Sequence, residues 1–186
     1  MQFPSDIGFS SAEPASNAPA YVSESQSLKT IAASTGTQRW EFSLTTVNLQ
    51  EKDFRRVWAF LNSLSGQAKT FNIAMPVLSK PLGIVSGTVQ ALTAYSKGDN
   101  SISFTNYLPE IGDFIKFVGH SKTYQILDTA GNSATIYPNL FADVTLSELV
   151  NVQDVLFKAR LSSKLSKLKI TTKKITKIKF KVIEAF

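Results

Sequence analysis

The stretch Glu110–Leu140 constrains the fold most, because it predicts three consecutive strands joined by two short turns. In Asp113–Val118, apolar side chains occupy both alternating faces, which favours a strand in the interior of a sheet. A Gly-His-Ser turn precedes the strand Thr123–Leu127, and an Ala-Gly-Asn turn precedes Ala134–Tyr137, where Pro138 ends the run. The stretch therefore predicts an antiparallel β-meander.

A connector that contains prolines precedes this region. Pro76 and Pro81 lie in the run PVLSKPLG, which no regular helix or strand accommodates. Beyond it, Gly87–Ala94 and Ser101–Phe104 predict two strands around a turn at residues 97–100. With the meander this makes about five short strands, which fit a small barrel of the OB type better than a sandwich.

The N-terminal part predicts an arm and two strands. Met1–Ala20 is rich in Ser, Ala, Pro and Asn, and we expect an arm that is either disordered or ordered on a neighbouring subunit through Phe3 and Phe9. Tyr21–Ala33 and Gln38–Val47 are expected to be the two strands of a hairpin. The second of them alternates apolar and polar residues, so it predicts one buried face.

An amphipathic helix is predicted for Asn48–Gly66. Asn48 and Glu51 have the spacing of a capping box, and Gly66 is a typical stop. Apolar residues recur at helical spacing: Phe54, Val57, Trp58, Leu61 and Leu64. The opposite face carries Arg55 and Arg56, which either face solvent or contact a neighbouring subunit.

The C-terminal part returns to strand-like patterns. After a further strand at Thr70–Met75, they recur at Val152–Leu161 and in two lysine-rich runs, Lys164–Thr172 and Lys174–Ile183. The predicted fold is mainly β: a β-sandwich core domain with one α-helix, interrupted by an inserted OB-like small β-barrel. The expected parts are an N-terminal arm (1–20), a discontinuous core domain (21–82 plus 151–186) and the inserted barrel (83–150).

Composition excludes several classes of site. The 186 residues include no Cys and one His, His120, which removes disulfides and leaves a poor ligand set for zinc, so no metal or cofactor is expected. No apolar run is long enough to span a bilayer and the N-terminus lacks the pattern of a secretion signal, so we expect a soluble protein made in a cytoplasm, without membrane contact.

The positive charge lies at the C-terminal end. Residues 1–150 carry ten Lys/Arg and twelve Asp/Glu, whereas residues 151–186 carry ten and two. In the last run Lys177, Lys179 and Lys181 alternate with apolar residues, which places them on one face of a strand.

Three readings of this lysine stripe are open: it binds phosphates, it protects a sheet edge, or it is a solvated face. Lys in place of Arg, and the lack of aromatic residues on that face, argue against specific nucleic-acid contact. The stripe is also a candidate subunit interface.

Catalysis has little support, because the titratable residues are spread singly along the chain. Asp113 is better explained as a turn residue than as a general base, and His120 is expected to be exposed in a turn. The common phosphate-loop, nucleophile-elbow and metalloprotease motifs do not occur. The sequence therefore predicts a protein that is not an enzyme.

Three segments carry a family resemblance: Gly112-Asp113-Phe114-Ile115-Lys116, Lys122-Thr123-Tyr124-Gln125-Ile126 and Ile136-Tyr137-Pro138-Asn139-Leu140-Phe141. In order and spacing they resemble the insert of distal tail proteins of long-tailed bacteriophages, and weaker similarity runs from Arg39 through Arg160. The resemblance implies a virion protein of the tail tip, whose core domain forms a homo-hexameric ring. Such a ring connects the tail tube protein to the tail hub and the host-recognition apparatus. The Lys-rich end departs from the expected pattern, because a positive lumen would retard DNA.

Two alternatives to this function remain. One is another baseplate or tail-tube structural component. The other is an oligonucleotide- or glycan-binding module of the OB type. The charge of the insert argues against it, because residues 97–128 contain three Lys and four Asp/Glu and so offer no basic binding face.

Overall fold

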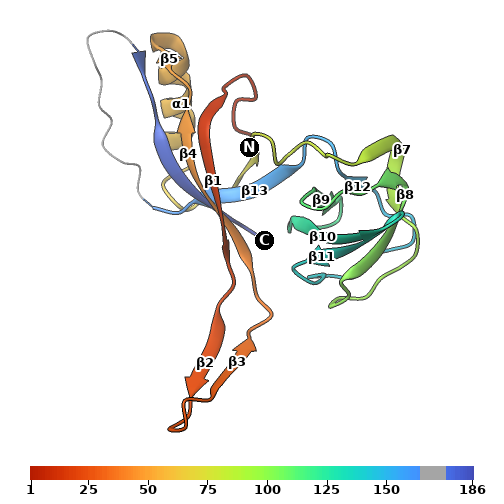
Figure 1. Cartoon of the computed structure of the whole chain (residues 1–186). Helices are drawn as coiled ribbons and strands as arrows, with labels where there is room; N and C mark the ends of the chain where they lie inside the picture. The colour runs from red at the N-terminus through yellow and green to blue at the C-terminus, as the bar shows by residue number, and fades with distance from the viewer. Residues whose placement is uncertain (164–174) are drawn as a thin grey trace.

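The structure, a computed structural model, describes residues 1–163 and 175–186 and contains two large β-sheets, a short two-stranded sheet and a hairpin that projects from one of the large sheets (Figure 1). The predicted fold class is confirmed: the chain is mainly β, with one α-helix among the described residues and a small barrel-like unit. The predicted run Lys164–Thr172, with Lys167 and Lys169, lies outside the described residues.

The first sheet is built from both ends of the chain. Its order is β1-β4-β15-β13-β6, and every neighbouring pair is antiparallel. The strands are β1 (Phe9–Asn17), β4 (Arg39–Thr46), β15 (Lys179–Glu184), β13 (Leu156–Leu161) and β6 (Phe71–Ala74).

Alternation in β4 and β15 explains why they pair at the centre of this sheet. Phe42 and Leu44 face inward opposite Val182 and Phe180, and all four side chains are buried. Phe42 also packs edge to face on Phe157 of β13, with 5.0 Å between ring centroids. The sheet curls around this apolar cluster, and β1 and β6 are left as its two edges.

Helix α1 (Glu51–Ser63) covers the cluster with Val57 and Leu61, which are fully buried, whereas Trp58 is only half-buried. The predicted capping box is wrong. Gln50 is the N-cap residue and no side chain caps the helix, because β5 (Leu49–Gln50) pairs with β14 (Ile175–Thr176) and delays the helix start. Asn48 is therefore too far from the first helical N–H groups.

The N-terminal residues differ from the expected arm. Phe3 and Ile7 are buried in the apolar cluster, and β1 pairs with β4 along most of its length. Phe3 finds aromatic partners in Phe9 and Phe60, at 5.2 and 5.7 Å between centroids. Few apolar residues are sufficient here, because Phe3 and Phe9 pack against other rings, Ile7 is buried in the same cluster, and the polar remainder forms an edge strand.

The predicted single strand Tyr21–Ala33 is also wrong. It is a hairpin of β2 (Ala20–Glu24) and β3 (Thr30–Ser34), closed by residues 25–29. The turn has no Gly or Pro to mark it: the amide N–H of Lys29 donates to the Ser25 hydroxyl at 3.2 Å, and Leu28 adopts φ +60°.

The second sheet has the order β12-β9-β10-β11-β8-β7, and β12 approaches β7 to nearly close a barrel around its own apolar cluster. Closure is made by the Gln90–Leu149 bridge and by the amide of Ala91, which donates to the Glu148 carbonyl at 2.9 Å. The strands are β7 (Ile84–Ala91), β8 (Ser101–Leu108), β9 (Phe114–Phe117), β10 (Tyr124–Ala130), β11 (Ser133–Tyr137) and β12 (Val150–Asn151).

The predicted meander is confirmed as β9, β10 and β11, and β9 lies inside the sheet between β12 and β10. One apolar face of β9 packs into the cluster of the first sheet, and the other packs into the cluster inside the barrel. Phe114 packs on Trp40 and Phe157 of the first sheet, at 5.2 and 5.5 Å between centroids, whereas Ile115 and Phe117 are in the barrel interior.

Candidate assembly surface

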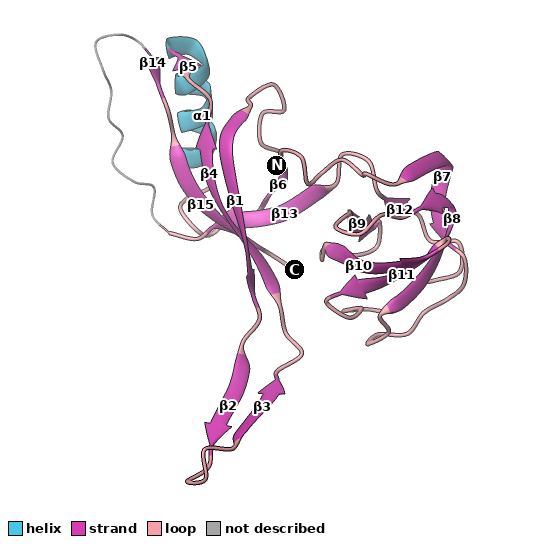
Figure 2. Ribbon diagram, viewed as in Figure 1, coloured by secondary structure: helices cyan, strands magenta, loops and turns pink. Residues whose placement is uncertain are grey.

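The β2–β3 hairpin is the most exposed element of the described chain. It projects from the ends of β1 and β4, away from both sheets (Figure 2), and every residue of its two strands is exposed. Its apolar side chains include Tyr21 and Leu28, 76% and 79% exposed, together with Val22 and Ile31. An isolated two-stranded hairpin is marginal in water. These side chains therefore form a surface suited to contact with another protein chain.

Both faces of the hairpin carry apolar residues. The register pairs Tyr21 with Ala33 and Ser23 with Ile31, so Tyr21, Ile31 and Ala33 lie on one face. Val22 and Ala32 pair with each other on the other face. A partner can thus cover the hairpin from either side.

Lys179 and Lys181 lie on the solvent face of the first sheet, whereas Lys177 lies between β14 and β15, where the predicted strand Lys174–Ile183 is interrupted. All three lysines are exposed, and the predicted alternation is confirmed because Ile178, Phe180 and Val182 are buried. The edge-protection reading is wrong, since β15 is paired on both sides, with β4 and with β13.

An acidic neighbour stands beside this stripe. Glu41 of β4 accepts from Asn17 Nδ2 at 2.8 Å and from Arg39 Nε at 2.9 Å. The hydrogen bond from Asn17, and then the positive charges of Arg39 and Lys181, lower the pKa of Glu41. The outer face therefore carries both signs of charge.

Arg55 and Arg56 lie on α1, on the other side of the sheet from the lysine stripe, and their charges have partners within the chain. Arg55 Nη2 donates to Glu51 at 2.6 Å, one helical turn away. Arg56 pairs with Asp6 of the N-terminal segment and approaches Asp53 at 3.9 Å. The structure does not bring these arginines together with Lys179 and Lys181.

His120 and Asp113 have structural environments. The expected exposure of His120 is wrong, because the residue is only 9% exposed, with Nδ1 3.0 Å from the Tyr124 hydroxyl and Nε2 3.2 Å from the Asp143 carbonyl. The Asp113 carboxylate is buried and accepts from the amides of Leu82 and Gly83 at 2.7 and 3.0 Å, from the Glu110 amide and from the Tyr107 hydroxyl. It thereby ties the proline-containing connector to the barrel.

A buried ion pair joins the barrel to the first sheet. Lys122 donates to Glu184 and to Gln38 Oε1, the latter at 2.7 Å, and Glu184 also accepts from the Thr123 amide at 2.8 Å. Lys122 is 1% exposed. Burial lowers the pKa of Lys122 and raises the pKa of Glu184, because desolvation disfavours both charged forms.

A hydrogen bond to the backbone and an aromatic ring complete this contact between the barrel and the first sheet. The Trp40 indole N–H donates to the Thr123 carbonyl at 2.9 Å, and the ring of Phe186 lies 5.0 Å from the Lys122 ammonium. The sequence did not predict this pair, although Glu184 offered a signal: it follows the buried Phe180 and Val182 on the inward face of β15, where an apolar residue is expected. Lys122 lies in the connection between β9 and β10 and carries no such signal.

The described part of the chain, residues 1–163 and 175–186, holds no group of three or more His, Asp or Glu side chains placed to bind a metal ion. Over the same residues, no helix has the length and apolar character of a membrane span. A scan against protein-family models and a search of curated proteins found no match to this chain.

Proposed function

We propose that this chain is a structural virion protein of a long-tailed bacteriophage: a distal tail protein that forms a homo-hexameric ring at the tail tip. The ring would connect the tail tube protein to the tail hub and the host-recognition apparatus, and the chain would be made in the host cytoplasm. This proposal starts from the resemblance of residues 112–141 to the insert of that family. It involves neither catalysis nor a cofactor.

One observation carries the self-assembly part of the proposal. The β2–β3 hairpin exposes Tyr21, Val22, Leu28 and Ile31 on an element with no sheet beneath it. Ordering such a hairpin costs conformational entropy that only burial offsets. A symmetric assembly supplies that burial with copies of the same chain.

The Asp113 network fits a scaffolding role. Its carboxylate fixes the connector at Leu82 and Gly83, and the Lys122–Glu184 pair fixes the second point of contact between barrel and first sheet. Two attachments hold the barrel in one orientation. A rigid placement of this kind is what a ring needs to present its inserts to neighbouring tail components.

Light scattering on the purified full-length chain tests this proposal. We expect the mass of a hexamer for the unaltered chain and a monomer when Tyr21, Val22, Leu28 and Ile31 are replaced by Ser. The matched control carries Ser at Leu92, Leu108, Leu127 and Leu146, which are exposed on the barrel. The unaltered chain as a monomer at every concentration, or equal loss of assembly in both variants, would contradict the proposal.

If the chain were instead an oligonucleotide-binding module, its affinity for nucleic acid would depend on the salt concentration. A barrel that binds nucleic acid through phosphates loses affinity steeply between low and moderate salt. A filter-binding titration with single-stranded DNA at both salt concentrations separates the two functions, because our proposal expects no saturable binding at moderate salt.

A further inference from the structure

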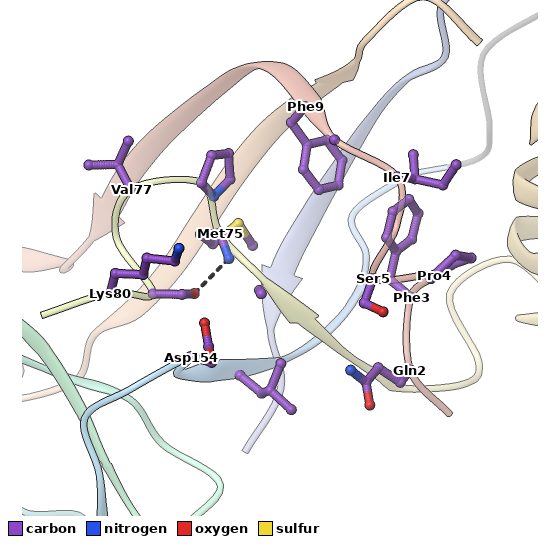
Figure 3. Close-up of a pocket in the computed structure, with 15 residues that line it drawn as sticks. Gln2, Phe3, Pro4, Ser5, Ile7, Phe9, Met75, Val77, Lys80 and Asp154 are labelled. Carbon is purple, nitrogen blue, oxygen red and sulfur yellow. Dashed lines mark hydrogen bonds between the residues drawn. The ribbon is translucent and has the colours of Figure 1, made fainter.

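A groove, called here the seam groove, opens between β1 and β6, the two edge strands of the first sheet. It has a volume of about 510 Å³ and lies between the N-terminal segment, the end of β6 and the connector that follows β6 (Figure 3). Its lining is mostly apolar and includes Phe3, Ile7, Phe9, Met75, Val77 and Leu156. This volume lies within the range of pockets that bind compact ligands and exceeds that of one side chain.

The groove exposes backbone as well as apolar side chains. β1 and β6 are the two edges of the sheet, and both Phe9 and Ala74 line the groove. The Asn72 amide donates to Met1 and its carbonyl accepts from Phe3, each at 2.9 Å, so Asn72 bonds on the side away from β13. By antiparallel alternation Ala74 points its N–H and C=O to the same side. An inserted segment therefore meets hydrogen-bonding groups there.

Val77 is a further sign of a contact site. It is 82% exposed at the groove and has φ +67°, a conformation that β-branched residues rarely adopt. Strained backbone concentrates at binding sites, where a partner or the fold holds it. An exposed valine in this conformation is well explained by a partner that covers it.

The tip of the β2–β3 hairpin has the matching chemistry. Leu28 projects at the turn, flanked by Glu24 and Lys29. The groove carries Lys80 and Asp154 among its lining residues. The apolar side chain at the hairpin tip thus matches the apolar lining of the groove. The tip and the groove each carry one positive and one negative side chain, so two pairs of opposite charge can form.

The hairpin of the same chain does not reach this groove. β1 begins at Phe9 beside the groove and ends at Asn17, where the chain leads into the hairpin, so the two sites lie at opposite ends of β1 (Figure 1). A strand of nine residues spans roughly 30 Å. The hairpin also points away from the N-terminus, so only a second copy can bring the tip to the groove.

We infer that the hairpin tip of one copy docks in the seam groove of the next copy, with Leu28 against Val77 and Phe9, Glu24 facing Lys80 and Lys29 facing Asp154. This contact joins two different surfaces, so its repetition is head-to-tail and generates a closed ring when the rotation between copies closes. The inference rests on the self-assembly in the proposed function and names the site that receives the hairpin.

Disulfide trapping tests the contact, because the chain has no Cys. A variant with Leu28→Cys and Val77→Cys is oxidised and analysed by denaturing electrophoresis. A disulfide requires Cα atoms within about 7 Å, so we expect a ladder of covalent multimers that reduction removes. The control pairs Leu28→Cys with Leu92→Cys, an exposed barrel residue, and should give no ladder beyond the dimer.

Solution assembly supplies the second readout. Leu28→Asp should weaken self-association at least about tenfold, while circular dichroism stays unchanged because Leu28 is exposed in the single chain. Assembly that persists without the 28–77 ladder overturns this inference and leaves the proposed function standing. A chain that stays monomeric overturns both.

Discussion

The ammonium group of Lys122 and the carboxylate of Glu184 form an ion pair between the barrel and the last strand of the first sheet, and both side chains are almost wholly buried. The two residues are 62 positions apart in the chain. Their contact fixes how the inserted barrel sits on the unit that contains both termini.

Replacing Lys122 by Met should lower the free energy of unfolding by about 3–5 kcal/mol, because it leaves a buried carboxylate without its cation. The double variant Lys122→Met/Glu184→Leu should recover most of that loss, since two apolar side chains of similar size replace the pair. Urea denaturation measures both. Lys97→Met, at an exposed barrel position, is the control. A double variant as unstable as the single one would contradict this explanation.

Because the pKa of Glu184 is raised in the folded protein, the contribution of Glu184 to the free energy of unfolding should decrease as the pH rises. Burial raises this pKa above the ordinary value of 4.5, so the folded protein takes up the proton before the unfolded chain does. The contribution of Glu184 to the free energy of unfolding is therefore complete below pH 4.5 and is lost as the pH rises through the folded value. The variant Glu184→Gln lacks a titratable group at this position and serves as the reference. The unaltered chain should gain stability relative to this variant on acidification toward pH 4.5, and a relative loss would refute the assignment.

Removing the Asp113 carboxylate should destabilise the attachment of the connector. Asp113→Ala leaves the buried amides of Leu82 and Gly83 without their acceptor, and we expect a loss of about 1.5–3 kcal/mol per charged hydrogen bond, with incomplete additivity. Tyr107→Phe removes one hydrogen bond to the same carboxylate and should cost less. Thermal unfolding ranks the two variants. Equal losses would mean that the backbone contacts of Asp113 contribute nothing.

Reversing the charge of the lysine stripe should affect assembly and not folding. Lys177, Lys179 and Lys181 are exposed, so their replacement by Glu should change the free energy of unfolding by no more than about 0.5 kcal/mol each. If the stripe contacts an adjacent ring, sedimentation will show altered stacking. Glu at Lys52, Lys69 and Lys97 makes the same charge change elsewhere and should leave stacking intact. Unchanged sedimentation of the stripe variant excludes the interface role.

Local patterns predicted the meander of the barrel and the buried face of β4 in the first sheet. The meander, the interior position of β9 and the apolar face of β4 all follow from alternation and turn residues within a few positions of one another. The double apolar character of β9 also has its explanation in the structure, where Phe114 and Ile115 enter different clusters.

The remaining features depend on contacts that local sequence does not contain. The hairpin turn around Leu28 has no Gly, Pro or Asn-Gly to mark it. Phe3 and Ile7 become core residues only because distant rings receive them. Glu184 interrupts the apolar face of β15, whereas Lys122 lies in the connection between β9 and β10, and nothing near either residue identifies the other as its partner.

The central claim is that copies of this chain form a closed ring. Electron microscopy of the purified full-length protein, with averaging of end-on views, measures it most directly. We predict rings of six-fold symmetry, whose hairpins bridge adjacent copies. Isolated single chains or open filaments in the same images would contradict it.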